Sequence, residues 1–236
     1  MRAVITGASS GIGLELAREL SRRGWELLLL ARRVELIEKL PRSEAVACDV
    51  TDVAAVRAAV HGTFDLAVAN AGVSIPNHAE KFSYADAEQV FRVNVLGMLA
   101  LYDAVIPSMI ERRSGRFAGI ASLAGLRGLP GAAPYSASKA AMQAFLEASR
   151  VELAPYGVGV TIVNPGFVTT AMTAKNRFRM PFLMTAERAA RIIADGLERG
   201  KRVVEFPGGT SLLMRVLRHA PDALYDRVLR TRGRKR

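Results

Sequence analysis

The chain has 236 residues, of which 50% are apolar, and it carries a formal net charge of +11 at pH 7. This length is compatible with one α/β domain over residues 1–236, and the composition is sufficient for a substantial core. The single cysteine, Cys48, excludes an intrachain disulfide and suits a reducing compartment, while three scattered histidines give no spacing for a metal site.

No targeting or membrane-spanning segment is expected. The first residues lead directly into a predicted strand, which leaves no room for a signal peptide. The apolar stretch Val93–Ile106 is interrupted by Asn94 and Asp103, so it falls short of the roughly 18 apolar residues of a spanning helix. We therefore expect a cytoplasmic protein.

Apolar runs alternate with helical patterns along the chain. They predict strands near residues 2–6, 25–30, 44–48, 64–69, 116–122, 158–163 and 202–206. The nearly continuous apolar run Trp25–Leu30 is typical of a strand covered on both faces. The alternation predicts a doubly wound parallel sheet of about seven strands with helices on both faces. Ligands of such sheets bind beyond the carboxyl ends of the strands.

A glycine-rich turn, Thr6–Gly13, follows the first strand and leads into a helix predicted over residues 14–23. Gly7 permits a tight turn, and Gly11 and Gly13 allow the backbone to approach a pyrophosphate and the helix to pack on the strand. No lysine follows the last glycine, so a P-loop is excluded. An ordinary turn is the alternative interpretation.

A second motif, Tyr135–Lys139, places a phenol and an ammonium four residues apart on one face of a predicted helix. A nearby ammonium favours the phenolate and lowers the pKa of the tyrosine, as acid–base chemistry near neutral pH requires. The alternative is an ordinary exposed ion pair on a helix surface.

These two motifs, in this order, resemble the short-chain dehydrogenase/reductase superfamily, from Met1 to about Thr170. The resemblance is strengthened by pieces that follow predicted strands or stand at matching intervals: Asp49-Val50, Asn70-Ala71-Gly72, Asn94, Ser122 and Asn164-Pro165-Gly166-Phe167-Val168-Thr169-Thr170. One departure is Ala69, where the family often has a second asparagine. The resemblance implies a Rossmann-like fold and a nicotinamide dinucleotide cofactor.

The resemblance also implies a catalytic group. Tyr135 would exchange a proton with the substrate oxygen, Lys139 would lower the pKa of Tyr135 and bind the nicotinamide ribose, and Ser122 would donate a hydrogen bond to the same oxygen. Asn94 would position a water that links Lys139 to solvent, with a helix-kinking or packing role as its alternative. Thr170 would bind the nicotinamide carboxamide, with Thr169 as a substitute.

Cofactor-binding residues follow from the same resemblance and gather at the predicted strand ends: Gly7, Ser9, Ser10, Gly11, Ile12, Gly13, Arg32, Arg33, Asp49, Val50, Asn70, Ala71, Gly72, Tyr135, Lys139, Pro165, Gly166, Val168 and Thr170. NAD-preferring members place an acid at the end of the second strand, where this chain has Ala31 followed by Arg32. A guanidinium can hold a 2′-phosphate, so we expect NADP(H) over NAD(H). Alternatively, Arg32 and Arg33 only begin the next helix.

The segment 171–200 is expected to cover the substrate. It mixes apolar and basic side chains, namely Met172, Lys175, Arg177, Phe178, Arg179, Met180, Phe182, Leu183 and Met184. This pattern suggests a hydrophobic carbonyl compound, and the basic residues suit an anionic head group. An ordinary lid whose apolar residues pack on the core is the alternative.

The positive charge is concentrated after residue 171. Residues 1–171 hold 17 Lys/Arg against 16 Asp/Glu, whereas residues 172–236 hold 16 against 6, so +10 of the +11 lies in the last part. Two short helices, 211–218 and 222–230, and a basic tail, 231–236, are predicted there. They could pack on the domain or on another subunit, remain solvated, or bind an anionic membrane surface; nucleic acid is a less favoured partner.

Three functional classes follow. The first is an NADP(H)-dependent oxidoreductase that interconverts a carbonyl and an alcohol on a hydrophobic small molecule. The second is a nucleotide-binding regulatory protein without turnover, and the third is a peripheral membrane protein, including a member that acts on lipid ketones. The resemblance also implies a homodimer or homotetramer, for which the long helix predicted over residues 132–154 is the candidate contact.

Overall fold

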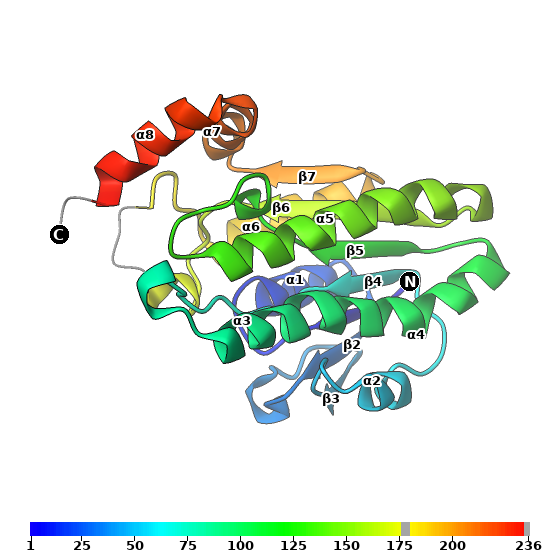
Figure 1. Cartoon of the computed structure of the whole chain (residues 1–236). Helices are drawn as coiled ribbons and strands as arrows, with labels where there is room; N and C mark the ends of the chain where they lie inside the picture. Colours follow the sequence, from blue (N-terminus) through cyan, green and yellow to red (C-terminus); the bar gives the residue numbers. More distant parts are fainter. Residues whose placement is uncertain (176–179, 234–236) are drawn as a thin grey trace.

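The computed structural model describes residues 1–175 and 180–233, and in them seven parallel strands form one sheet in the order β3-β2-β1-β4-β5-β6-β7 (Figure 1). The strands are β1 Arg2–Thr6, β2 Glu26–Ala31, β3 Ser43–Ala47, β4 Leu66–Ala69, β5 Arg116–Ile120, β6 Gly159–Pro165 and β7 Val203–Phe206. The order reverses between β1 and β4, which confirms the predicted doubly wound Rossmann-like sheet. At such a reversal, the chain leaves a crevice at the carboxyl ends of the strands.

Helices cover both faces of the sheet. The longer ones are α1 Gly11–Arg22, α2 Val53–Ala59, α3 Tyr84–Phe91, α4 Gly97–Arg112, α5 Ala133–Leu153, α6 Ala186–Glu198, α7 Gly208–His219 and α8 Asp222–Gly233. Apolar residues of α1 and α6 share one core cluster, and those of α2, α4 and α5 share the other. Shorter helical turns are η1 Val34–Leu36, η2 Ala79–Lys81, η3 Arg92–Leu96, η4 Leu123–Gly125, η5 Ala154–Tyr156 and η6 Thr173–Lys175.

The boundaries differ slightly from those predicted. The helix expected from residue 14 begins at Gly11, and the helix expected from residue 211 begins at Gly208, because helical hydrogen bonding starts inside the glycine-rich segments. β5 ends at Ile120 rather than at residue 122, since Ser122 caps η4 by accepting a hydrogen bond from the Ala124 main-chain nitrogen. Cys48 is buried, but it lies one residue beyond β3 rather than inside it.

The continuous helical run Tyr84–Arg112 is long and apolar enough to cross a membrane by length and composition. Within the described residues, this finding corrects the expectation that the chain has no stretch long and apolar enough to span a membrane. The run joins α3, the π-helical turn η3 and α4, and its buried side chains include Met98, Leu101, Val105 and Met109 in the core beside the sheet. Packing in this core explains the apolar character of the helix.

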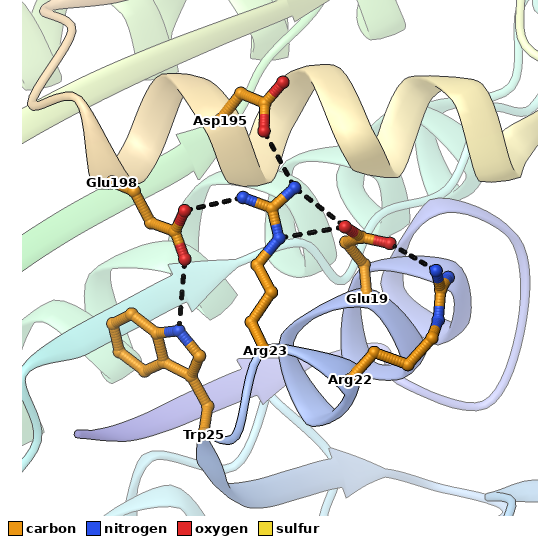
Figure 2. Close-up of polar contacts among 6 residues, drawn as sticks. All are labelled: Glu19, Arg22, Arg23, Trp25, Asp195 and Glu198. Atoms are coloured by element: carbon orange, nitrogen blue, oxygen red, sulfur yellow. Dashed lines mark hydrogen bonds and ion pairs between the residues drawn. The ribbon is translucent and has the colours of Figure 1, made fainter.

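The helices α1 and α6 are also joined by an ionic cluster at their carboxyl ends (Figure 2). The Arg23 guanidinium lies 2.7 Å from Glu19 Oε1, 2.8 Å from Asp195 Oδ1 and 2.6 Å from Glu198 Oε2. Arg22 binds the second oxygen of the buried Glu19 at 2.8 Å. The cluster supplements a close apolar contact between the two helices and thereby supports the position of the glycine turn at the other end of α1.

Candidate active site

A cleft of about 320 Å³ opens at the carboxyl ends of the strands. Nearly all the predicted site residues line it, together with others that were not predicted. The lining is Gly7, Ser9, Ser10, Gly11, Ile12, Ala31, Arg32, Arg33, Cys48, Asp49, Val50, Asn70, Ala71, Gly72, Val73, Val93, Ile120, Ala121, Ser122, Tyr135, Lys139, Pro165, Gly166, Val168, Thr170, Ala171, Met172 and Thr173. Two predicted residues, Gly13 and Asn94, lie outside this lining.

The glycine turn forms one wall of the cleft from main-chain atoms. Gly7 and Gly11 have φ angles of +68° and +58°, which L side chains rarely adopt. A Cβ on Gly7 would lie 2.8 Å from the Ala71 Cα, so the turn packs directly against the chain after β4. The helix α1 starts beside this turn without a side-chain cap from Ser10. Its free N–H groups and positive dipole suit a pyrophosphate.

Gly13 has a packing role. A Cβ at this position would overlap the Asn70 amide nitrogen and the Gly7 carbonyl oxygen. That same amide nitrogen donates hydrogen bonds to the carbonyl oxygens of Thr6 at 2.9 Å and Gly7 at 3.1 Å. The predicted packing of helix on strand holds, and Gly13 is not among the residues that line the cleft.

Arg32 and Asp49 lie where the cleft meets a second hollow of about 330 Å³. The second hollow is lined by Arg32, Asp49, Thr51, Ala85, Glu88, Gln89, Arg92 and Val93. Asp49 Oδ1 accepts hydrogen bonds from the Thr51 nitrogen and hydroxyl, each at 2.9 Å. The main-chain bond from Thr51, followed by its hydroxyl and the charge of Arg32, lowers the pKa of Asp49 against the opposing effect of burial.

Tyr135 is half-buried at the amino-terminal end of α5, where Pro134 suits the first helical turn. Its side chain lies close to that of Ser122, whose Oγ donates to the Pro165 carbonyl oxygen at 3.4 Å. Burial raises the pKa of Tyr135, and the neighbouring Ser122 hydroxyl only partly offsets this effect. The expectation that Lys139 lowers this pKa is therefore wrong for the protein alone.

Lys139 is 4% exposed and bonds away from the phenol oxygen. Its Nζ donates to the Ile120 carbonyl oxygen at 2.7 Å, contacts Met142 Sδ at 3.5 Å, and lies 5.8 Å from the centre of the Tyr135 ring. Burial lowers the pKa of Lys139 to about 7. These contacts also exclude the alternative of an exposed surface pair.

Asn94 lies in the π-helical turn η3 and is fully buried. Its Oδ1 accepts from the Val73 nitrogen at 2.8 Å, and its Nδ2 donates to the Val73 oxygen and to Ser138 Oγ, each at 3.0 Å. A Cβ on Gly72 would lie 3.2 Å from Asn94 Oδ1 and 3.5 Å from Lys139 Nζ. Asn94 thus has a packing role, and its side-chain oxygen and the Lys139 ammonium both lie close to Gly72.

Two residues that support this group were missed in the sequence. Ser138 Oγ donates to the Tyr135 carbonyl oxygen at 2.7 Å and receives the bond from Asn94. Gln143 Nε2 donates to the Ser122 carbonyl oxygen and to Asn164 Oδ1, each at 2.8 Å. Spacing of three or four residues from Tyr135 and Lys139 could have placed Ser138 and Gln143 on the same helix face.

The segment after β6 lies over the glycine turn, because a Cβ on Gly11 would be 3.0 Å from Thr170 Cγ2. Met184 is buried in the core, as expected of a lid that packs on the domain, whereas Phe182 and Leu183 are exposed. Coverage of the substrate by this segment stays a prediction. The predicted contributions of Arg177, Phe178 and Arg179 fall outside the described residues, as does that of the Lys175 side chain.

A doubly wound sheet with a glycine turn, an uncapped helix start and a serine–tyrosine–lysine group in one cleft defines the class of dinucleotide-dependent oxidoreductases. Comparison with known proteins agrees, because the short-chain dehydrogenase family matches residues 1–180. The chain belongs to this family and is an NAD(P)-dependent short-chain dehydrogenase/reductase.

Three similar proteins illustrate this relationship. The chain is 40% identical to an oxidoreductase of Myxococcus xanthus, over 97% of this chain and 96% of that protein. It is 30% identical to dehydrogenase/reductase SDR family member 7B of Mus musculus, over 98% of this chain and 81% of that protein. The solved structure of a short chain dehydrogenase from Burkholderia cenocepacia, in complex with NADP, superposes with a TM-score of 0.88 at 29% identity and covers 97% of both chains.

Proposed function

We propose that this protein interconverts a carbonyl and an alcohol on a hydrophobic small molecule with NADP(H), using Tyr135 as the acid–base residue. The observation that carries the proposal is that Ser122 and Tyr135 line the cleft together, next to the buried Lys139. A nucleotide-binding regulatory protein without turnover has no observation in its favour.

The residues of the cleft fit a dinucleotide. Side chains at Gly7 and Gly11 would obstruct the turn, and the first N–H groups of α1 suit the pyrophosphate. Lys139 and Thr170 would hold the nicotinamide ribose and carboxamide, and Asp49 and Val50 the adenine end. When bound, the cofactor supplies or accepts the hydride.

The protein's own task is to hold the substrate oxygen and move a proton. Ser122 would donate a hydrogen bond to that oxygen as negative charge develops on it, and Tyr135 would deliver the proton from its hydroxyl. In the free protein the pKa of Tyr135 is raised by burial, so the phenol is held in its protonated, donating form. A protonated Lys139 would restore its acidity when ligands bring the two groups together.

Replacing Tyr135 by phenylalanine tests this role. The Tyr135→Phe variant should lose about 10²–10⁴-fold in turnover, because general acid–base groups contribute this much, while its affinity for NADPH stays nearly unchanged. Turnover is measured as NADPH oxidation with a panel of apolar ketones and aldehydes, and binding by fluorescence titration. Turnover within about tenfold of the wild type would remove Tyr135 from the chemistry.

Preference for NADP(H) over NAD(H) rests on Arg32. It lies at the junction of the two hollows, and the end of β2 offers Ala31 instead of a carboxylate. Support also comes from the similar Burkholderia cenocepacia protein, which was solved with NADP.

The corresponding test compares both cofactors in the Arg32→Ala variant. A charged hydrogen bond contributes roughly 1.5–3 kcal/mol, so the ratio of NADPH to NADH affinity should fall by about one to two orders of magnitude. The matched control is Arg42→Ala, an exposed arginine whose guanidinium contacts Glu26 and the Gly24 carbonyl outside the cleft. An unchanged ratio in Arg32→Ala would show that another group sets the preference.

A further inference from the structure

The two last helices, α7 and α8, form a C-terminal arm (208–233) that exposes apolar side chains. Leu212 and Val216 of α7 are 66% and 60% exposed, and Leu224 of α8 is 53% exposed. The opposite side of α7 carries the buried Ser211 and Met214. An exposed apolar strip on a helix that is already attached through its other face marks an interaction surface.

This surface continues onto the segment that covers the cleft. Phe182 and Leu183 are exposed, and a Cβ on Gly209 would lie 3.0 Å from the Phe182 ring. Phe182 therefore adjoins the start of α7. Figure 1 shows the arm at the edge of the molecule, with α8 extending away from the sheet.

Charge decides which partner fits this surface. Residues 208–236 hold eight Lys/Arg and two Asp/Glu, a net charge of +6. Arg215, Arg218 and Arg227 are exposed on the described part of the arm. A second copy packed face to face through this strip would bring two such charges together, whereas an anionic lipid surface would neutralise them while taking up the apolar side chains.

We propose that the C-terminal arm docks the protein onto an anionic lipid surface. The exposed leucines and valine insert at the boundary between headgroups and acyl chains, and exposed basic side chains of the arm such as Arg218 bind the lipid phosphates.

The arm is held firmly enough to transmit this docking to the body. The Arg127 guanidinium donates to the carbonyl oxygens of Leu217 and Ala220 at 2.6 Å each and to Asp222 Oδ1 at 2.6 Å. It also lies 4.0 Å from the centre of the Tyr225 ring. Arg127 thereby caps the end of α7 and fixes the start of α8.

A second connection runs from α7 to the loop that carries Ser122. Arg215 binds Glu205 Oε2 at 2.9 Å, Glu205 Oε1 accepts from Asn164 at 3.1 Å, and Asn164 accepts from Gln143, which bonds the Ser122 carbonyl. Docking would hold this side of the cleft near the lipid. That consequence suits an apolar substrate and rests on the proposed function.

Vesicle flotation with the full chain tests the docking itself. Wild-type protein should bind vesicles of phosphatidylcholine mixed with phosphatidylglycerol and bind much less to phosphatidylcholine alone. The double variant Leu212→Glu/Val216→Glu should lose binding at least about tenfold, because it places two acids on the surface that meets the lipid. The control Val53→Glu makes the same change at an exposed position of α2, and it should bind like the wild type.

Circular dichroism and turnover of a soluble ketone show whether the double variant is folded, and both should match the wild type. Vesicle flotation itself is independent of the proposed function, because docking does not require turnover. The proposal is overturned if the wild-type protein does not bind anionic vesicles, or if the double variant binds them as well as the Val53→Glu control does. It is also overturned if light scattering shows that the double variant dissociates a wild-type oligomer, since the strip would then be an interface between copies.

Discussion

Helix α1 and the C-terminal arm are both tied to the body by a well-bonded arginine, but the two attachments are built differently. Arg23 joins α1 to α6 beside a large apolar contact that includes Leu16, Leu20, Ile193 and Leu197. Arg127 holds an arm that buries few apolar side chains, among them Met214 and Tyr225. The same residue type is therefore accessory in one place and a principal anchor in the other.

The comparison has a functional side. The α1 side of the cleft is expected to hold the cofactor, and it is built from close main-chain packing. The arm lies on the side of Ser122 and of Phe182, where side-chain hydrogen bonds carry more of the attachment. A closely packed wall suits a cofactor that must be bound in one position. A wall held mainly by side-chain hydrogen bonds suits the exchange of substrates.

The largest effect is expected where the main chain packs most closely. Gly13→Ala would place a methyl group against the Asn70 amide and the Gly7 carbonyl, which cannot move without breaking the Thr6 and Gly7 hydrogen bonds. We expect a loss of about 3 kcal/mol or more in the free energy of unfolding, together with lost cofactor binding. Urea unfolding measures this.

Gly208→Ala is the control, because a Cβ there meets nothing within 4 Å. Equal stability of the two variants would mean that the glycine turn is less closely packed than described.

A smaller effect separates the two arginines. Arg127→Ala removes the cap of α7 and the bond to Asp222, so the arm should open and exchange its amide hydrogens at least about tenfold faster. Arg23→Ala should change exchange in α1 and α6 far less, because the apolar contact between the helices remains. Hydrogen exchange followed by mass spectrometry compares them directly. A larger effect of Arg23→Ala would reverse the comparison.

The last expected effect has the opposite sign and is an increase in stability. Burial lowers the pKa of Lys139 from 10.5 to about 7, so the native state binds fewer protons than the unfolded state between these values. The native state therefore loses stability as pH falls through this window, and the cost is fully present below about pH 7. Lys139→Met should remove this cost of the buried amine. Because the hydrogen bond to Ile120 is also lost, we expect the protein without ligands to gain about 2 kcal/mol in stability near pH 7.

The pH dependence is the decisive readout for Lys139. The difference in free energy of unfolding between Lys139→Met and wild type should shrink as pH rises towards about 10. A difference that does not change with pH would show that Lys139 keeps its ordinary pKa. Turnover should be lost in the same variant.

Much of the architecture could be predicted from local patterns. The run Trp25–Leu30 predicts a strand that is buried on both faces, and the glycines of Thr6–Gly13 predict a turn before a helix. Both predictions are possible because these signals depend on residues close in sequence. Parallel connections then require the strand ends to meet at one edge. For that reason Asp49, Asn70 and Ser122 could be expected in one cleft from their positions after the predicted strands.

What the sequence by itself determined is thus the fold, the cleft and the residue types within it. Only the tertiary structure decided that Lys139 donates to the Ile120 carbonyl, that Gly13 makes room for Asn70, and that Arg127 holds an arm about ninety residues further along the chain. A pKa depends on burial and on every neighbouring dipole, and a largely buried arginine needs acceptors from distant segments. Neither has a signature in local spacing, because both arise only after the chain has packed.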